Sequence, residues 1–247
     1  MLRGFWKLTW VEMKVFLREP MGAVGSLVIP LVVFIGLGRA LGTGRLNAAG
    51  VDRAPFNVPV LAALMIALSA VLSLVAIMAI YRESGILKRL RATPLAPVTI
   101  LSAHVAVKIA FTSASLVLLV LAGRNFFPGA MDVDLLSFSA ALLLGTLSIL
   151  STGFVIASIV PTARFAQPIG AALFYPMVAV SGLFFPVQQI PQPVRAIAYA
   201  LPTTHAVALM QGAWAGTGWG AMWTNVGALV LIFAVCTSLA SRVFRWE

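Results

Sequence analysis

Charged side chains are scarce in this chain. Only 10% of its 247 residues are Asp, Glu, Lys or Arg, whereas 61% are hydrophobic. An ordinary soluble domain has about 25% charged and 45–50% apolar residues, so this chain lacks the groups that a water-facing surface needs. The composition therefore predicts an integral membrane protein.

Cysteine and histidine are almost absent. The single cysteine, Cys236, excludes an intrachain disulfide, and the two histidines, His104 and His205, fall at opposite membrane faces in the topology derived below. The sequence has no GxxxxGK[ST] phosphate loop, no HExxH and no GxSxG motif. We therefore expect no catalytic residue, metal or cofactor in this chain.

Acidic residues are few, and none falls within a predicted span. The seven are Glu12, Glu19, Asp52, Glu83, Asp132, Asp134 and Glu247. Carriers driven by proton or sodium gradients commonly rely on buried carboxylates, so this distribution argues against a secondary transporter. The net charge of +10 indicates basic cytoplasmic loops rather than a nucleic-acid partner.

Long uncharged runs locate the membrane spans. The gaps between charges reach the roughly 20 residues that a bilayer-crossing helix needs. They predict one all-α transmembrane domain over residues 1–247. Its six spans are about 21–41, 58–80, 100–122, 135–160, 167–185 and 222–242.

The basic residues orient these spans. With the amino terminus inside, eleven of the seventeen Lys and Arg residues are cytoplasmic, five are extracellular and Lys108 lies within a span. The positive-inside rule therefore predicts that both termini are cytoplasmic. We expect Lys108 to snorkel toward the cytoplasmic interface, with a role in a substrate pathway as the alternative.

The amino-terminal residues 1–19 form an amphipathic pattern. Trp6, Trp10, Met13 and Leu17 fall on one helical stripe, and Arg3, Lys7, Lys14 and Arg18 fall on another. The pattern predicts an interfacial helix that ends at Pro20. A simple positive-inside anchor is the alternative.

A proline-rich segment precedes the last predicted span. Pro186, Pro191, Pro193 and Pro202 leave residues 186–205 too broken for one continuous helix. We expect a short extracellular helical hairpin, re-entrant or interfacial, with an ordinary external loop as the alternative.

The stretch YRESGILKRLRATPL, residues 81–95, concentrates charge after the second span. In a helix over 82–94, Ile86, Leu87 and Leu90 share one side while Lys88 and Arg91 share another. Such a helix could rest on lipid headgroups or enter a groove on a soluble partner.

Three motifs in this order resemble the permeases of type-2 ABC exporters. RESGILKRLRATPL resembles the loop that forms their coupling helix, with matches at Arg82, Glu83, Gly85, Leu87, Lys88, Arg89, Leu90, Arg91, Pro94 and Leu95. SGLFFPVQQIP with LPTTH resembles their extracellular hairpin, with matches at Ser181, Gly182, Phe185, Pro186, Leu201, Pro202, Thr204 and His205. REP at 18–20 resembles the step before their first span. Ala208 and Gln211 depart from the acidic residue and arginine that the family often carries there.

The resemblance implies a permease subunit in a prokaryotic plasma membrane. Two permease chains, identical or different, would pair, and each would dock one of two ATPase subunits that hold ATP and Mg. The compact loops favour a small amphiphilic substrate, and the interior hydroxyls are Ser69, Ser73, Thr112, Ser113, Ser115 and Ser148. These hydroxyls could equally be small packing residues at helix contacts. A stand-alone carrier or channel, and a membrane scaffold without transport, are the alternative functions.

Overall fold

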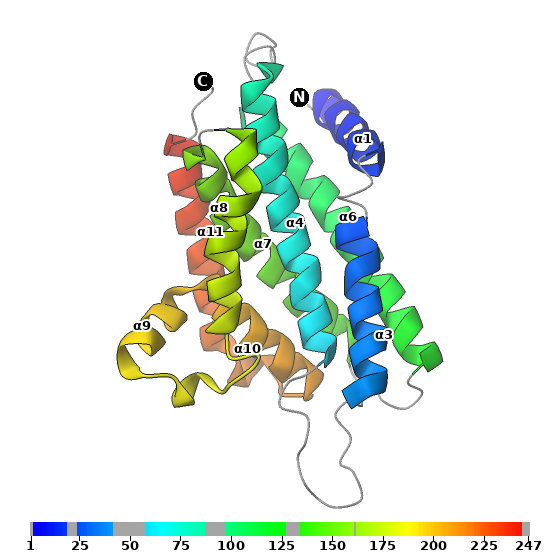
Figure 1. The fold of residues 1–247 in the computed structure, drawn as a ribbon, viewed down its shortest axis with the longest axis vertical. Coiled ribbons are helices and arrows are strands. Elements are labelled where there is room, and N and C mark those ends of the chain that lie inside the picture. Colours follow the sequence, from blue (N-terminus) through cyan, green and yellow to red (C-terminus); the bar gives the residue numbers. More distant parts are fainter. Residues whose placement is uncertain are drawn as a thin grey trace, which may run out of the picture.

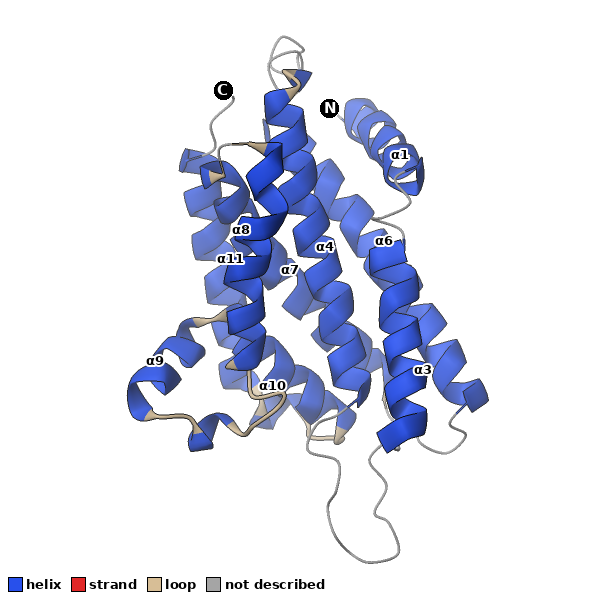
Figure 2. Cartoon of the chain, viewed as in Figure 1, coloured by secondary structure: helices blue, strands red, loops and turns tan. Residues whose placement is uncertain are grey.

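The computed structural model describes residues 2–18, 24–41, 58–86, 97–126, 134–160 and 162–243. Within these ranges the chain is helical, and no strand occurs (Figure 2). The elements are α1 (Leu2–Arg18), the π-helix η1 (Val24–Val28), α3 (Ile29–Leu41), α4 (Val58–Glu83), α6 (Pro97–Phe126), α7 (Leu135–Ile159), α8 (Ala163–Ala179), the 3-10 turn η2 (Val187–Gln189), α9 (Gln192–Ala200), α10 (Pro202–Trp214), the 3-10 turn η3 (Trp219–Ala221) and α11 (Trp223–Val243).

Four of these helices, α4, α6, α7 and α11, are long and apolar enough to cross a membrane. The all-α, multi-pass class predicted from composition is thereby confirmed. Helix α3 is apolar but shorter, and α8 has 17 residues with two internal prolines, Pro168 and Pro176. The count of six spans therefore stays a prediction.

The long helices run side by side along the longest axis of the molecule (Figure 1). The start of α1 and the end of α11 lie at one end, where α1 packs beside α6, and α9 and α10 lie at the opposite end (Figure 1). A chain that crosses the membrane an even number of times begins and ends on the same side. Which end faces the cytoplasm stays a prediction from the basic residues.

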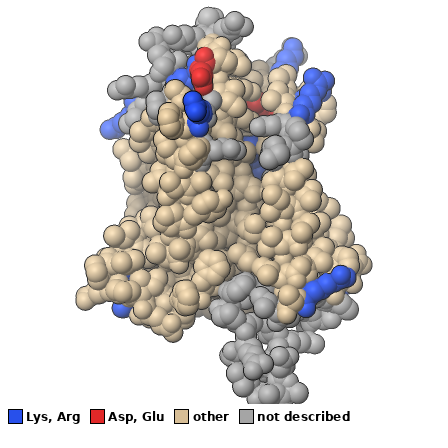
Figure 3. Space-filling model, in the orientation of Figure 1, with Lys and Arg blue, Asp and Glu red and all other residues tan. Residues whose placement is uncertain are grey.

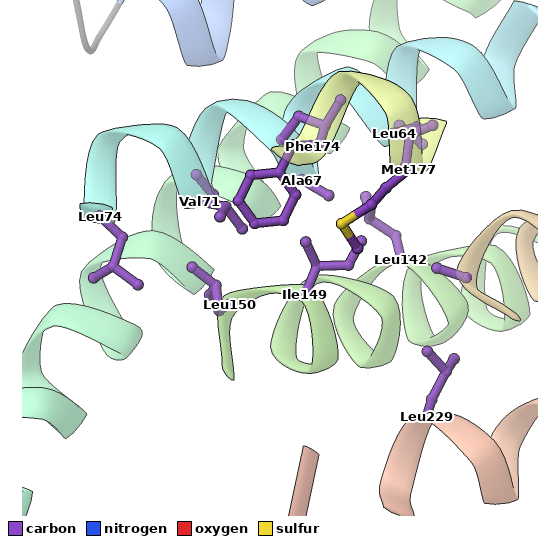
Figure 4. Close-up of a cluster of buried hydrophobic side chains, with 14 of the residues drawn as sticks. Leu64, Ala67, Val71, Leu74, Leu142, Ile149, Leu150, Phe174, Met177 and Leu229 are labelled. Atoms are coloured by element: carbon purple, nitrogen blue, oxygen red, sulfur yellow. The ribbon is translucent and has the colours of Figure 1, made fainter. Parts of the chain in front are cut away.

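Helices α4 and α7 form the centre of the bundle. Their apolar side chains meet those of α8 and α11 in one continuous core (Figure 4). Small residues allow this close approach: a Cβ added at Gly153 would lie 2.8 Å from Val71 Cγ1, and one at Gly145 would lie 3.0 Å from Ala206 Cβ. Packing through small residues is typical of membrane helices, which cannot rely on the hydrophobic effect to associate.

The outer surface of the bundle is apolar. Charged side chains gather toward its two ends, and the band between them is almost free of charge on the face shown in Figure 3. Helix α11 is the most exposed long helix, with only 11% of its apolar window buried. Leu231 is 64% exposed near its middle. In a bilayer, such an apolar face lies against lipid or against another membrane-spanning chain.

Candidate functional site

The predicted coupling segment begins at the end of α4. Arg82 and Glu83 form the last turn of α4, and Gly85, with φ +71°, turns the chain out of the helix. The Ser84 N–H donates to Ile80 O at 2.9 Å and the Gly85 N–H to Arg82 O at 3.1 Å, which satisfies carbonyls that the helix end leaves open. The last six predicted docking residues lie outside the described residues: Leu87, Lys88, Arg89, Leu90, Arg91 and Pro94.

Arg82 points back into the bundle. Its guanidinium donates hydrogen bonds to Val160 O at 2.6 Å and to Ala157 O at 2.9 Å, at the carboxyl end of α7. A cation at this position also complements the negative end of the helix dipole. Ile86 packs against the main core, whereas Glu83 is exposed. The structure thus gives Arg82 and Ile86 contacts within the chain.

A polar cluster lies beneath α1, beside the same turn of α4. Helix α1 buries Thr9, Glu12 and Phe16, which recur at helical spacing, while Trp6 and Trp10 are more than 60% exposed. The Tyr81 hydroxyl donates to the Glu12 carboxylate, 2.9 Å from each oxygen. This contact joins α1 to the end of α4.

The same carboxylate approaches α6. Glu12 Oε2 lies 3.5 Å from His104 Nδ1, and the His104 ring packs edge-on against Tyr81 with centroids 5.5 Å apart. Burial raises the pKa of Glu12 above its usual 4.5, while the Tyr81 hydrogen bond and the positive charge of Lys108 act in the opposite direction. Within the described part of the chain, His104 Nε2 is buried without a hydrogen-bond partner.

Lys108 completes the cluster, and the snorkelling prediction was wrong. The side chain is only 2% exposed, its Nζ donates to Ser73 Oγ at 2.7 Å, and Nζ lies 3.9 Å from the centroid of the Phe16 ring. Because α1 covers this face of α6, the ammonium is held by a hydroxyl and a ring face instead of by water. Burial of Lys108 depends on Phe16, 92 residues earlier in the chain, so the composition of one span could not reveal it.

The opposite end of the bundle carries the predicted hairpin. The region predicted as 186–205 contains η2 and α9, and its last residues begin α10, which continues to Trp214 and packs on α7 and α11. Pro202 is the first residue of α10, where its missing N–H costs nothing. Phe185, Pro186 and Pro191 are exposed.

Hydrogen bonds hold together the end of the bundle that carries the hairpin. The ring of His205 lies between Asn225 Oδ1 and Tyr199 O, each 2.9 Å from a ring nitrogen, and so links α9, α10 and α11. The buried Ser181 hydroxyl donates to Val178 O at 2.7 Å. The chain then turns at Gly182, which has φ +87°. Glycine suits this position, because a residue with a side chain would be strained in this conformation.

Two cavities accompany these regions. One, of about 430 Å³, lies between the end of α8, η2, α9, α10 and α11, and its lining includes Gly182, Gln188, Thr204, Gln211 and Asn225. The other, of about 240 Å³, is apolar and lies between α6, α7 and α11. Among the described residues, no three His, Cys, Asp or Glu side chains gather in a way that could hold a metal ion.

The predicted site residues therefore form two groups at opposite ends of the bundle. Arg82, Glu83, Gly85 and Ile86 lie near the polar cluster at the end with the termini, and the hairpin residues lie at the other end (Figure 1). Sequence reasoning missed Glu12 as a buried group because it treated α1 as a surface helix. The 3–4 spacing of Thr9, Glu12 and Phe16 was the available signal.

Comparison with known proteins identifies the family of this chain. The family model described as ABC-2 type transporter matches residues 3–214. The chain is also similar to "Nodulation protein J" of Neorhizobium galegae, with 27% identity over 237 residues that cover 90% of this chain and 87% of that protein. The match spans the predicted coupling segment and the hairpin alike. The chain therefore belongs to the ABC-2 type transporter family, as its membrane permease subunit.

Proposed function

We propose that this permease exports a small amphiphilic substrate from the cytoplasm, with ATP hydrolysed by separate subunits. Two permease chains pair, each docked on an ATPase subunit through segment 82–94, and the substrate passes between them by alternating access. Permeases of this family generally work with ATPase subunits, and this chain has no phosphate loop of its own.

One observation carries the proposal: the turn of α4 that leads into segment 82–94 is attached to three other helices. Arg82 holds it to α7, and Tyr81 holds it to α1, whose Glu12 also reaches α6. A force applied to the segment would therefore move these helices together, since packed helices shift as rigid bodies. If the segment had no such attachments, the same force would move the loop without moving the helices.

The apolar cavity supports an amphiphilic substrate. Its lining joins Leu150 and Phe154 of α7 to Phe233 of α11, the most exposed of the long helices. An aliphatic chain fits this lining, because none of its described residues has an ionisable side chain.

Docking is tested by placing charge on the apolar side of the segment. Burying one leucine stabilises a complex by about 1.5–3 kcal/mol, whereas an exposed ion pair contributes about 0–1 kcal/mol. We expect Leu87→Asp or Leu90→Asp to release the ATPase subunit during copurification in detergent. Glu83→Ala should leave the complex assembled but reduce substrate-stimulated hydrolysis.

Leu136→Asp is the matched control, because Leu136 is 81% exposed at the amino end of α7, far from α4's last turn. It should retain the ATPase. Full retention of partner and transport by both Leu87→Asp and Leu90→Asp would exclude segment 82–94 as the docking element.

A carrier driven by a proton gradient is the second candidate, because Glu12, His104 and Lys108 are buried together. The chain reconstituted alone in vesicles separates the two functions. Substrate flux that follows an imposed pH gradient without any ATPase would favour the carrier, and flux only with the ATPase and ATP favours the exporter.

A further inference from the structure

The described residues that line the cavity at the α9–α10 end include several polar side chains and none that is charged. Three carboxamides, Gln188, Gln211 and Asn225, and the hydroxyl residue Thr204 share it with apolar side chains such as Leu183 and Val187. Among the residues that the structure describes, no Asp, Glu, Lys or Arg lines the cavity. Arg195 of α9 does not contribute, since its guanidinium donates to Ile190 O from Nε at 3.3 Å and from a terminal nitrogen at 3.1 Å.

Thr204 combines a place in the lining with a hydroxyl that is not used within the described chain. It is 3% exposed, and its Oγ1 is buried without a hydrogen-bond partner in the described chain. The preceding residue differs, because Thr203 Oγ1 donates to Met177 O at 3.0 Å. Buried hydroxyls are normally paired, and a threonine in a helix has two accessible χ1 rotamers, one of which can turn its hydroxyl toward a ligand.

The walls of the cavity are held in place. Thr204, Ala208 and Gln211 follow one another on one face of α10 at i, i+4 and i+7. His205 fixes the carbonyl of Tyr199 and the side chain of Asn225. A prearranged lining reduces the entropy lost when a ligand binds.

We infer that this cavity binds an uncharged, hydroxyl-rich group, such as a single sugar ring, at the polar end of the transported amphiphile. Carboxamides and hydroxyls donate and accept hydrogen bonds, as sugar hydroxyls do, and the apolar side chains can face C–H groups. An ion would be desolvated here without a counter-charge from the described lining residues. At about 430 Å³ the cavity lies within the range of small-molecule sites. That the bound group belongs to the transported molecule rests on the proposed function.

The test measures equilibrium binding to the purified full chain in lipid nanodiscs without any ATPase. Saturation-transfer NMR detects the bound probe. Three probes share one ring and differ in charge: methyl glucoside, glucuronate and glucosamine. Methyl glucoside should bind, and each charged ring should bind at least about fivefold more weakly. Equal binding of all three, or no binding of methyl glucoside, would overturn the inference.

Variants locate the site. Thr204→Val should weaken methyl glucoside binding about fivefold to tenfold without lowering the unfolding temperature, because the buried hydroxyl has no partner to lose. Thr146→Val is the matched control, since Thr146 is also buried with an unpartnered Oγ1 but lies in α7 outside the cavity. Unchanged binding in Thr204→Val, or an equal loss in Thr146→Val, would overturn the site.

Gln211→Glu provides a second check that keeps the side-chain shape. The added carboxylate should shift preference from methyl glucoside toward glucosamine. An unchanged order of the three probes would contradict the assignment. Binding in nanodiscs together with no ATP-dependent export in the full complex would retain the site and reject the proposed function.

Discussion

The two ends of the bundle bury polar groups in different ways. Beneath α1, an acid and a lysine lie in one cluster, and Glu12 and Lys108 each contact groups on other helices. In the cavity at the α9–α10 end, the polar side chains among the described residues are all uncharged, and the Thr204 hydroxyl has no partner within that part of the chain. Internally satisfied charges hold helices together, whereas unsatisfied neutral groups remain available to a ligand. The comparison suggests that the cluster beneath α1 attaches helices to one another, whereas the cavity at the α9–α10 end is suited to binding a ligand.

The largest expected effect comes from breaking the charged cluster. Lys108→Met removes the cation and leaves the Glu12 carboxylate buried, which should destabilise the fold by about 3 kcal/mol. Thermal unfolding followed by tryptophan fluorescence measures this loss. Lys14→Met is the control, because Lys14 is exposed and its Nζ lies 5.2 Å from the centroid of the Trp10 ring.

A double variant sharpens this prediction. Glu12→Gln combined with Lys108→Met removes both charges, so most of the lost stability should return. If the double variant is as unstable as the sum of the two single ones, Glu12 and Lys108 are independent, and the cluster is not a unit.

A smaller effect is expected at the uncharged end. Gly182→Ala puts a side chain at φ +87° and a Cβ 2.8 Å from Val187 Cγ2, and should cost about 2 kcal/mol. Gly216→Ala meets the same backbone strain at φ +72° but open space, and should cost about 1 kcal/mol. Denaturant unfolding compares the two. Equal losses of stability in the two variants would mean that the Val187 side chain can move aside and that this wall of the cavity is not rigid.

The smallest effect concerns pH. Burial raises the pKa of Glu12. The Glu12 carboxyl therefore holds its proton more firmly when α1 is packed on the bundle than when α1 is detached from it. This contribution is fully present below pH 4.5 and is lost as the pH rises through the raised pKa. The mobility of a spin label at Val11, measured by EPR, should therefore increase with pH. Glu12→Gln should abolish the change, and Glu83→Gln, an exposed control, should not. A pH response that persists in Glu12→Gln would assign it to another group.

The sequence predicted much of the fold but little of the buried chemistry. Gaps between charges located α4, α6, α7 and α11 because a bilayer imposes length and apolarity on each helix separately. The burial of Glu12 and Lys108 was not predicted, because it depends on α1 packing across α6, a contact between distant segments of the chain. Pro202 correctly marked a break in the hairpin, but the continuation of α10 to Trp214 depends on packing against α7 and α11.

Helix α11 has one further consequence. Its 21 residues rise about 31 Å, close to the roughly 30 Å hydrocarbon thickness of a bilayer, and most of its surface faces outward. A thinner membrane would tilt such a helix, at a cost of fractions of a kcal/mol per Å of mismatch. Asn225, in its first turn, is the partner of His205 and lines the uncharged cavity. Tilting would therefore move a wall of the cavity, and the thickness of the surrounding membrane would adjust its shape.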